Sequence, residues 1–159
     1  MSWIDDTVKQ VDREAADNSK RYQALHTELS PTVMKMFSEI GDKIFSKEGF
    51  FGKKRYYDIE TLSNKANKSF GWRFKINTDK VSGSFDIVIY ISELAGEEEK
   101  IKHPGLLGKN CLRVHANCGS VGHVQLVDSD SEKSLEECLA EAVTTYLREI
   151  KRFGGKIFF

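Results

Sequence analysis

The stretch "FGWRFKIN" (residues 70–77) marks a change in how apolar residues are spaced along the chain. Large apolar residues stand at every second position, and Gly71, Arg73 and Lys75 separate them. This period of two predicts a β-strand with one buried face, because successive side chains of a strand point to opposite sides of a sheet. The segment "GSFDIVIYISEL" (residues 83–94) has the same period and predicts a second strand.

Two further strands are predicted after these, at about 111–117 and 122–128, with a turn centred on Gly119. The four strands would form a mostly antiparallel sheet over about residues 70–128. One face of this sheet is apolar and requires a cover, whereas the other is polar and can remain open to solvent. Residues 50–69 allow two interpretations, a strand near Tyr56–Leu62 or a short helix.

The chain before residue 49 has helical spacing instead. Seven apolar residues keep alternating steps of four and three, with Asn18 filling one gap: Ile4, Val8, Val11, Ala15, Tyr22, Leu25 and Leu29. Ser30-Pro31 then predicts an N-cap and a first-turn proline, which would open a second helix. The sequence thus predicts two N-terminal helices within about 3–48. The first is longer than a small domain needs, so it would pair in a helical hairpin or contact a second subunit.

The last helix is predicted at about 134–153. Ser134 and Glu137 form a capping-box pattern, and helical spacing continues until Gly154-Gly155. The three apolar residues that close the chain, Ile157 to Phe159, predict an edge strand or a contact with another subunit. Together these patterns predict one α+β domain over 1–159, with two N-terminal helices, a sheet of about four strands and a C-terminal helix packed on one sheet face.

Composition limits the function classes. The 24 basic and 24 acidic residues give a formal net charge of zero, so global attraction to nucleic acid or to an anionic membrane has no support, although local patches can act. No apolar stretch is long enough to span a membrane, and three cysteines without a secretory signal predict reduced thiols in the cytoplasm. From the long first helix and the apolar tail we expect a homodimer without a membrane partner.

The stretch "NCLRVHANCGSVGHVQL" (residues 110–126) contains the residues most typical of chemistry. On one strand Cys111 and His115 would stand about 13 Å apart, too far to share a zinc ion. If the turn centres on Gly119, His115 and His123 would face each other with Cys118 in the turn. This spacing matches no zinc pattern, so we predict neither a metal nor a cofactor. Cys118, with His115 or His123 as its base, is the weak catalytic candidate of an enzyme hypothesis.

The polar face of the predicted sheet supports the leading hypothesis, a non-enzymatic binding or assembly module. An anionic or planar small ligand, or a protein partner, would suit its cations and ring. Strand alternation places these candidate ligand-binding residues there: Arg73, Lys75, Tyr90, Arg113, His115, His123 and Gln125.

The region between residues 47 and 80 supports an alternative, a nucleic-acid-binding protein. It has nine basic and four acidic residues, interleaved with aromatic residues. Cations can contact phosphates, and rings can stack on bases. The aromatic residues of the strand at 70–76 face the predicted core, so only Tyr56, Tyr57, Phe50 and Phe51 would be available. With zero net charge, we rank nucleic acid below the binding module.

Overall fold

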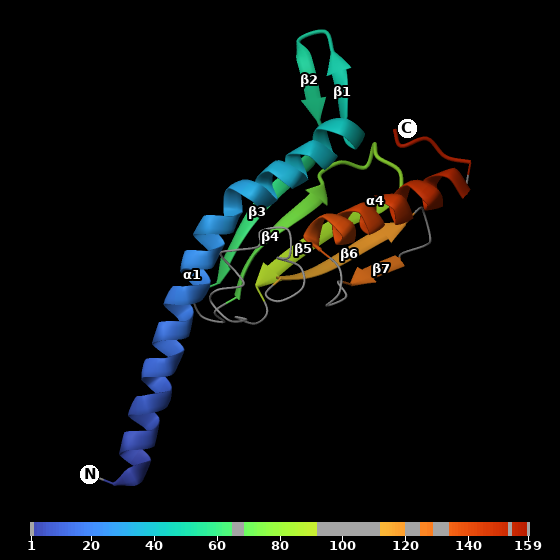
Figure 1. Cartoon of the computed structure of the whole chain (residues 1–159). Helices are drawn as coiled ribbons and strands as arrows, with labels where there is room; N and C mark the ends of the chain where they lie inside the picture. Colours follow the sequence, from blue (N-terminus) through green and yellow to red (C-terminus); the bar gives the residue numbers. More distant parts are fainter. Residues whose placement is uncertain are drawn as a thin grey trace.

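The computed structural model describes residues 2–64, 69–91, 112–119, 125–128, 134–152 and 154–158. Within these residues the chain forms one long N-terminal helix, a two-stranded hairpin, a five-stranded antiparallel sheet and a C-terminal helix (Figure 1). The predicted α+β class is confirmed.

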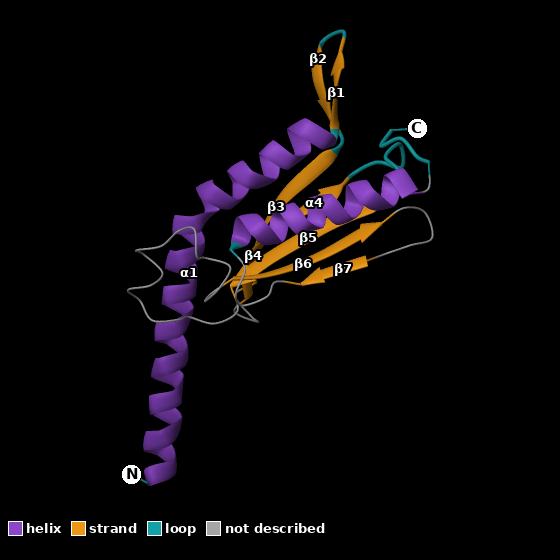
Figure 2. Cartoon of the chain, turned by 45° about the vertical axis from the view of Figure 1, so that its right-hand side comes forward, coloured by secondary structure: helices purple, strands orange, loops and turns teal. Residues whose placement is uncertain are grey.

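The N-terminal helix, α1 (Trp3–Ile44), is continuous over 42 residues, so the prediction of two helices is wrong. Pro31 lies inside it. Ser30 does not cap a new helix; its hydroxyl donates a hydrogen bond to the carbonyl of His26 at 2.7 Å. Val33 and Phe37, which follow the proline, are fully buried, and this packing offsets the backbone hydrogen bond that Pro31 cannot donate. Figure 2 shows that the helix bends along its length, as an internal proline favours.

The main sheet contains five strands rather than four. Each strand is antiparallel to the next, in the order β3 (Tyr57–Asn64), β4 (Ser69–Ile76), β5 (Ser84–Ile91), β6 (Leu112–Gly119) and β7 (Gln125–Asp128). β3 lies within residues 50–69, for which the sequence allowed either a strand or a short helix. The strand is confirmed. Before it, β1 (Ser46–Gly49) and β2 (Gly52–Arg55) form a separate hairpin that projects from the main sheet (Figure 1).

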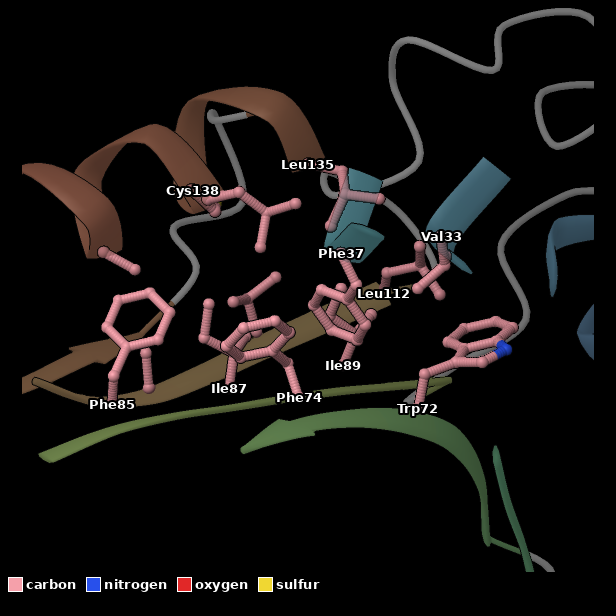
Figure 3. Close-up of a cluster of buried hydrophobic side chains, with 14 of the residues drawn as sticks. Val33, Phe37, Trp72, Phe74, Phe85, Ile87, Ile89, Leu112, Leu135 and Cys138 are labelled. Carbon is pink, nitrogen blue, oxygen red and sulfur yellow. The ribbon is translucent and has the colours of Figure 1, made fainter. Parts of the chain in front are cut away.

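The core lies between the sheet and the two helices. The second half of α1 packs on β3 and β4, and α4 (Leu135–Arg152) packs on β5, β6 and β7, both on the same sheet face (Figure 2). The alternating apolar residues of β4 and β5 point into this layer as predicted (Figure 3). The largest fully buried side chains are Trp72, Tyr146, Phe37, Phe45 and Phe74.

The C-terminal helix is also confirmed. The backbone N–H of Glu137 donates to Ser134 Oγ at 3.2 Å, which is the N-cap contact that the sequence predicts. After α4 the tail returns to its own chain, where Ser82 N–H donates to the carbonyl of Ile157 at 2.7 Å and Phe158 forms a bridge with Val81. Ile157 and Phe158 are half-buried there, so the tail no longer supports the prediction of a dimer.

Candidate functional site

The outer face of the sheet is the side away from the two helices. Arg73, Lys75, Tyr90, Arg113 and His115 alternate along their strands with fully buried residues, so they lie on this face as predicted. The register aligns positions of the five strands in rows, one of which runs from Glu60 through Arg73, Val88 and His115 to Asp128. The placement is confirmed, and a role in ligand binding stays a prediction.

Two cations of this face are paired with carboxylates. Arg73 donates from Nε to Asp86 Oδ1 at 3.1 Å and from Nη2 to Asp86 Oδ2 at 2.5 Å. The ammonium of Lys75 lies 2.7 Å from Glu60 Oε1, and the hydrogen bond with Lys75 lowers the pKa of Glu60. Glu60 belongs to β3, which the sequence did not fix as a strand. An anionic ligand would therefore have to compete with two carboxylates that are already in place.

The hairpin of β6 and β7 differs from the prediction. His115 has Asp128 as its register partner, and Cys118 has Gln125, so the hairpin centres midway between Cys118 and Gln125, beyond Gly119. The prediction that His115 faces His123 is wrong, because β6 runs on as far as Gly119, which pairs with Ser84 of β5. His123 lies outside the described residues, and for Gln125 only the backbone register is described.

Cys118 lies inside β6 and not in a turn. It is fully buried, its register partner is Phe85, and burial raises the pKa of its thiol to about 12. His115 is three residues earlier in the same strand and therefore points to the opposite face of the sheet. These two side chains cannot act as nucleophile and base. Cys111 and His123, the other candidates, lie outside the described residues, and within the described part no three His, Cys, Asp or Glu side chains gather to hold a metal ion.

A surface of a different kind lies on the first half of α1, which we call the α1 arm (residues 3–21). Figure 1 shows the arm projecting beyond the sheet. The predicted apolar stripe follows it: Ile4, Val8 and Val11 are each more than half exposed, and Trp3, just before the stripe, is 76% exposed. The same stripe becomes buried at Leu25, where α1 reaches the sheet. The arm thus presents to solvent the face with which the rest of α1 packs.

A shallow groove runs between the second half of α1 and the beginning of α4. Its volume is about 330 Å³, and its walls consist of Met36, Glu39, Ile40, Glu136, Leu139, Ala140, Val143 and Thr144. No local pattern in the sequence indicates this groove, because its two walls are about a hundred positions apart and only the tertiary structure brings them together.

The tip of the β1–β2 hairpin exposes two phenylalanines completely. Phe50 is 96% exposed and Phe51 99%, and their ring centroids are 5.1 Å apart at an angle of 81°. Gly49 and Gly52 flank them, and Lys47 and Lys54 are register partners behind them. The two phenylalanines belong to the aromatic residues predicted to be available, but their place at the tip of a projecting hairpin was not predicted. By contrast, Tyr57 is buried and is not available to stack on a base.

Comparisons of the chain with protein family models, with curated proteins and with solved structures find no match. Among the helices that the structure describes, none has the length and apolar character needed to cross a membrane.

Proposed function

We propose that this protein is a non-enzymatic assembly module that pairs with a second copy of itself through the α1 arm. The observation that supports this proposal is the exposed stripe of Ile4, Val8 and Val11 on a helix that projects from the rest of the chain. Most of the stability of a helix in a protein comes from packing of its apolar face, and on the arm this face is exposed. Pairing would remove the stripe from water and stabilise the helix at the same time.

The spacing of the stripe favours a coiled coil between two copies. Steps of four and three are those of the a and d positions of a heptad repeat, and a second copy supplies an identical seam. Asn18 occupies one seam position, where a polar residue can fix the register of two helices at some cost in stability. A closed symmetric dimer is the simplest assembly that this seam can form.

The charges beside the seam favour parallel helices. In a parallel pair, Thr7 of one copy lies beside Asp12 of the other, and Glu14 lies beside Ser19, so that no like charges meet. An antiparallel pair centred on the arm would place Asp12 of one copy beside Asp12 of the other, and likewise the two Glu14 residues, so that like charges would meet. The parallel helices would separate before Leu25, where each α1 packs on its own sheet.

The other surfaces support a function less well. A ligand at the outer sheet face would have to displace Asp86 from Arg73 or Glu60 from Lys75. A cysteine-dependent enzyme would need a thiolate, but Cys118 is buried and its pKa is raised. Pairing through the arm requires neither the displacement of a bound carboxylate nor a reactive thiolate, because the apolar residues of the arm are already exposed.

Sedimentation equilibrium of the full chain tests the proposal. We expect a concentration-dependent dimer that Val8→Asp with Val11→Asp converts to a monomer, because two carboxylates in the seam would lack partners. Gln10→Asp with Ala16→Asp, on exposed positions outside the stripe, adds the same charge to the same helix and should leave the dimer intact. A monomeric wild type over the whole concentration range, or a dimer that both double variants retain, would refute the arm as the interface.

The orientation of the helices has a separate test. In a parallel dimer the two Ala15 residues face each other across the seam, so Ala15→Cys should form an intermolecular disulfide under mild oxidation. Gln10→Cys, away from the seam, is the matched control. Equal cross-linking of the two variants would rule out the parallel coiled coil.

A further inference from the structure

The β1–β2 hairpin is held firmly at its base, so that its tip is presented in a fixed position. Asp42, near the end of α1, accepts hydrogen bonds through Oδ1 from Arg55 Nε at 2.8 Å and from the Tyr57 hydroxyl at 2.5 Å. The backbone N–H of Tyr56 donates to the carbonyl of Phe45, which is fully buried, at 2.9 Å. Ser46 and Arg55 themselves form the first register pair of the hairpin.

The tip has no side chain that forms hydrogen bonds. It consists of Gly49, Phe50, Phe51 and Gly52, and both rings are almost fully in water. Single exposed apolar residues are common on protein surfaces, but two adjacent fully exposed rings at the end of a projecting hairpin are not explained by packing among the residues that the structure describes. They form a small apolar wedge.

A basic collar surrounds the wedge. The collar consists of Lys47, Lys53 and Lys54, all exposed, and the hairpin has one acidic residue, Glu48. Lys47 and Lys54 are direct register partners, an arrangement of like charges that destabilises a hairpin in the absence of an anion. Their ammonium groups lie over the rings of Phe158 and Tyr56, at 4.5 and 5.4 Å from the ring centroids, and these contacts offset part of the cost.

The distance between wedge and collar matches a lipid interface. Lys47 in β1 precedes Phe50 in the turn by three residues, or at most about 10 Å at about 3.3 Å per residue. Apolar residues of peripheral proteins enter the boundary of headgroups and acyl chains by about 5–10 Å. When the rings reach this depth, the backbone positions of the lysines lie near the level of the headgroup phosphates. To contact them, the side chains of Lys47 and Lys54 would exchange the rings of Phe158 and Tyr56 for the phosphates.

We propose that the hairpin docks on an anionic lipid surface, with Phe50 and Phe51 inserted and the three lysines contacting headgroups. A lipid surface fits better than a nucleic acid, because the tip offers no hydrogen-bond donor or acceptor side chain to a base edge, and its two rings lie edge to face rather than parallel as successive stacked bases would require. The sequence predicted no membrane partner from the lack of a spanning segment and from the zero net charge. Neither property decides whether a local basic patch with an apolar tip binds to a surface.

Vesicle flotation with the full chain tests the proposal. We expect binding to phosphatidylcholine vesicles that contain phosphatidylserine, little binding to pure phosphatidylcholine, and release as ionic strength rises. Phe50→Ser with Phe51→Ser should weaken binding by about tenfold or more, because the inserted apolar area is lost. Lys53→Glu with Lys54→Glu should weaken it further, since each lysine contributes roughly fivefold. Both pairs are exposed, so a thermal melt should show that the fold is kept.

Two controls separate docking by the hairpin from other causes. Lys20→Glu with Lys80→Glu changes the net charge equally at exposed positions elsewhere and should retain binding. Phe51→Trp, made with Trp3→Phe, should show a blue shift and quenching by brominated lipids only in anionic vesicles, relative to Trp3→Phe alone, whose emission comes from the buried Trp72.

Three results would overturn the proposal. The first is a wild type that does not bind anionic vesicles, and the second is binding that survives loss of both phenylalanines. The third is hairpin-dependent binding to single-stranded oligonucleotides without any binding to vesicles. This result would assign the surface to nucleic acid.

Discussion

The ring of Tyr57 lies against the backbone of Gly41, so closely that a β-carbon on Gly41 would be 2.4 Å from two of the ring carbons. Real β-carbons do not approach other atoms to this distance. Glycine is therefore the residue that lets the first strand of the main sheet pass directly under the last turns of α1. The same tyrosine donates its hydroxyl hydrogen bond to Asp42, which also receives Arg55 at the base of the hairpin.

Gly41→Ala should destabilise the protein even though alanine is the better helix former. The helix propensity of alanine would add about 1 kcal/mol, but displacing the tyrosine ring is overpacking, which costs about 1–3 kcal/mol. We expect a net loss of about 1–2 kcal/mol in the free energy of unfolding, measured by urea denaturation. Tyr57→Leu, which removes the ring from this contact, should make Gly41→Ala less costly. Equal or higher stability of Gly41→Ala alone would contradict the contact.

Asp42 should make stability depend on pH in the acid range. The hydrogen bonds from Arg55 and then Tyr57 lower the pKa of Asp42 below its ordinary value of 3.8. A carboxylate with a lowered pKa in the folded state stabilises the protein above the ordinary pKa, and this stabilisation is lost as pH falls through the lowered value. The wild type should therefore melt at a higher temperature than Asp42→Asn at neutral pH, and the gap should close in strong acid. Asp79→Asn is the control. A gap that is independent of pH would disprove the assignment.

The thiol of Cys118 should be unreactive in the folded protein. Burial raises its pKa to about 12, so the thiolate that attacks alkylating reagents is scarce at neutral pH, and the side chain is also inaccessible. We expect iodoacetamide to label Cys118 only in denaturant, as peptide mass spectrometry would show. Labelling of the native chain with a midpoint below pH 7 would instead restore the enzyme hypothesis.

The pair of Arg73 and Asp86 should be coupled more strongly than that of Lys75 and Glu60. The guanidinium makes two hydrogen bonds to one carboxylate, whereas Lys75 has a single contact with Glu60. Solvent reaches both pairs, so screening limits a double-mutant cycle on Arg73 and Asp86 to about 0.5–1 kcal/mol. The lysine pair should give less, and salt should reduce both. A larger coupling for the lysine pair would contradict this account of the outer face.

Local patterns predicted much of the fold. The period of two in β4 and β5 identified their buried faces, and the helical spacing and the cap at Ser134 identified α4. These features can be predicted from the sequence because the position of a residue in a strand or helix decides which face its side chain lies on, and a buried face requires apolar residues at those positions. The stripe from Ile4 onward was readable for the same reason, and it contains the residues on which the proposed assembly rests.

Contacts between distant segments decided the rest. Ser30-Pro31 has the pattern of a helix start, but α1 continues through it because Val33 and Phe37 are buried against the sheet, and no local signal encodes that packing energy. The register of β6 is set by its pairing with β5 as well as by its own turn, so Cys118 became a core residue. Glu60 pairs with Lys75 only because β3 joins the sheet. The sequence determined which faces are apolar, and the tertiary structure determined which of them are covered, since covering a face requires a partner from elsewhere in the chain.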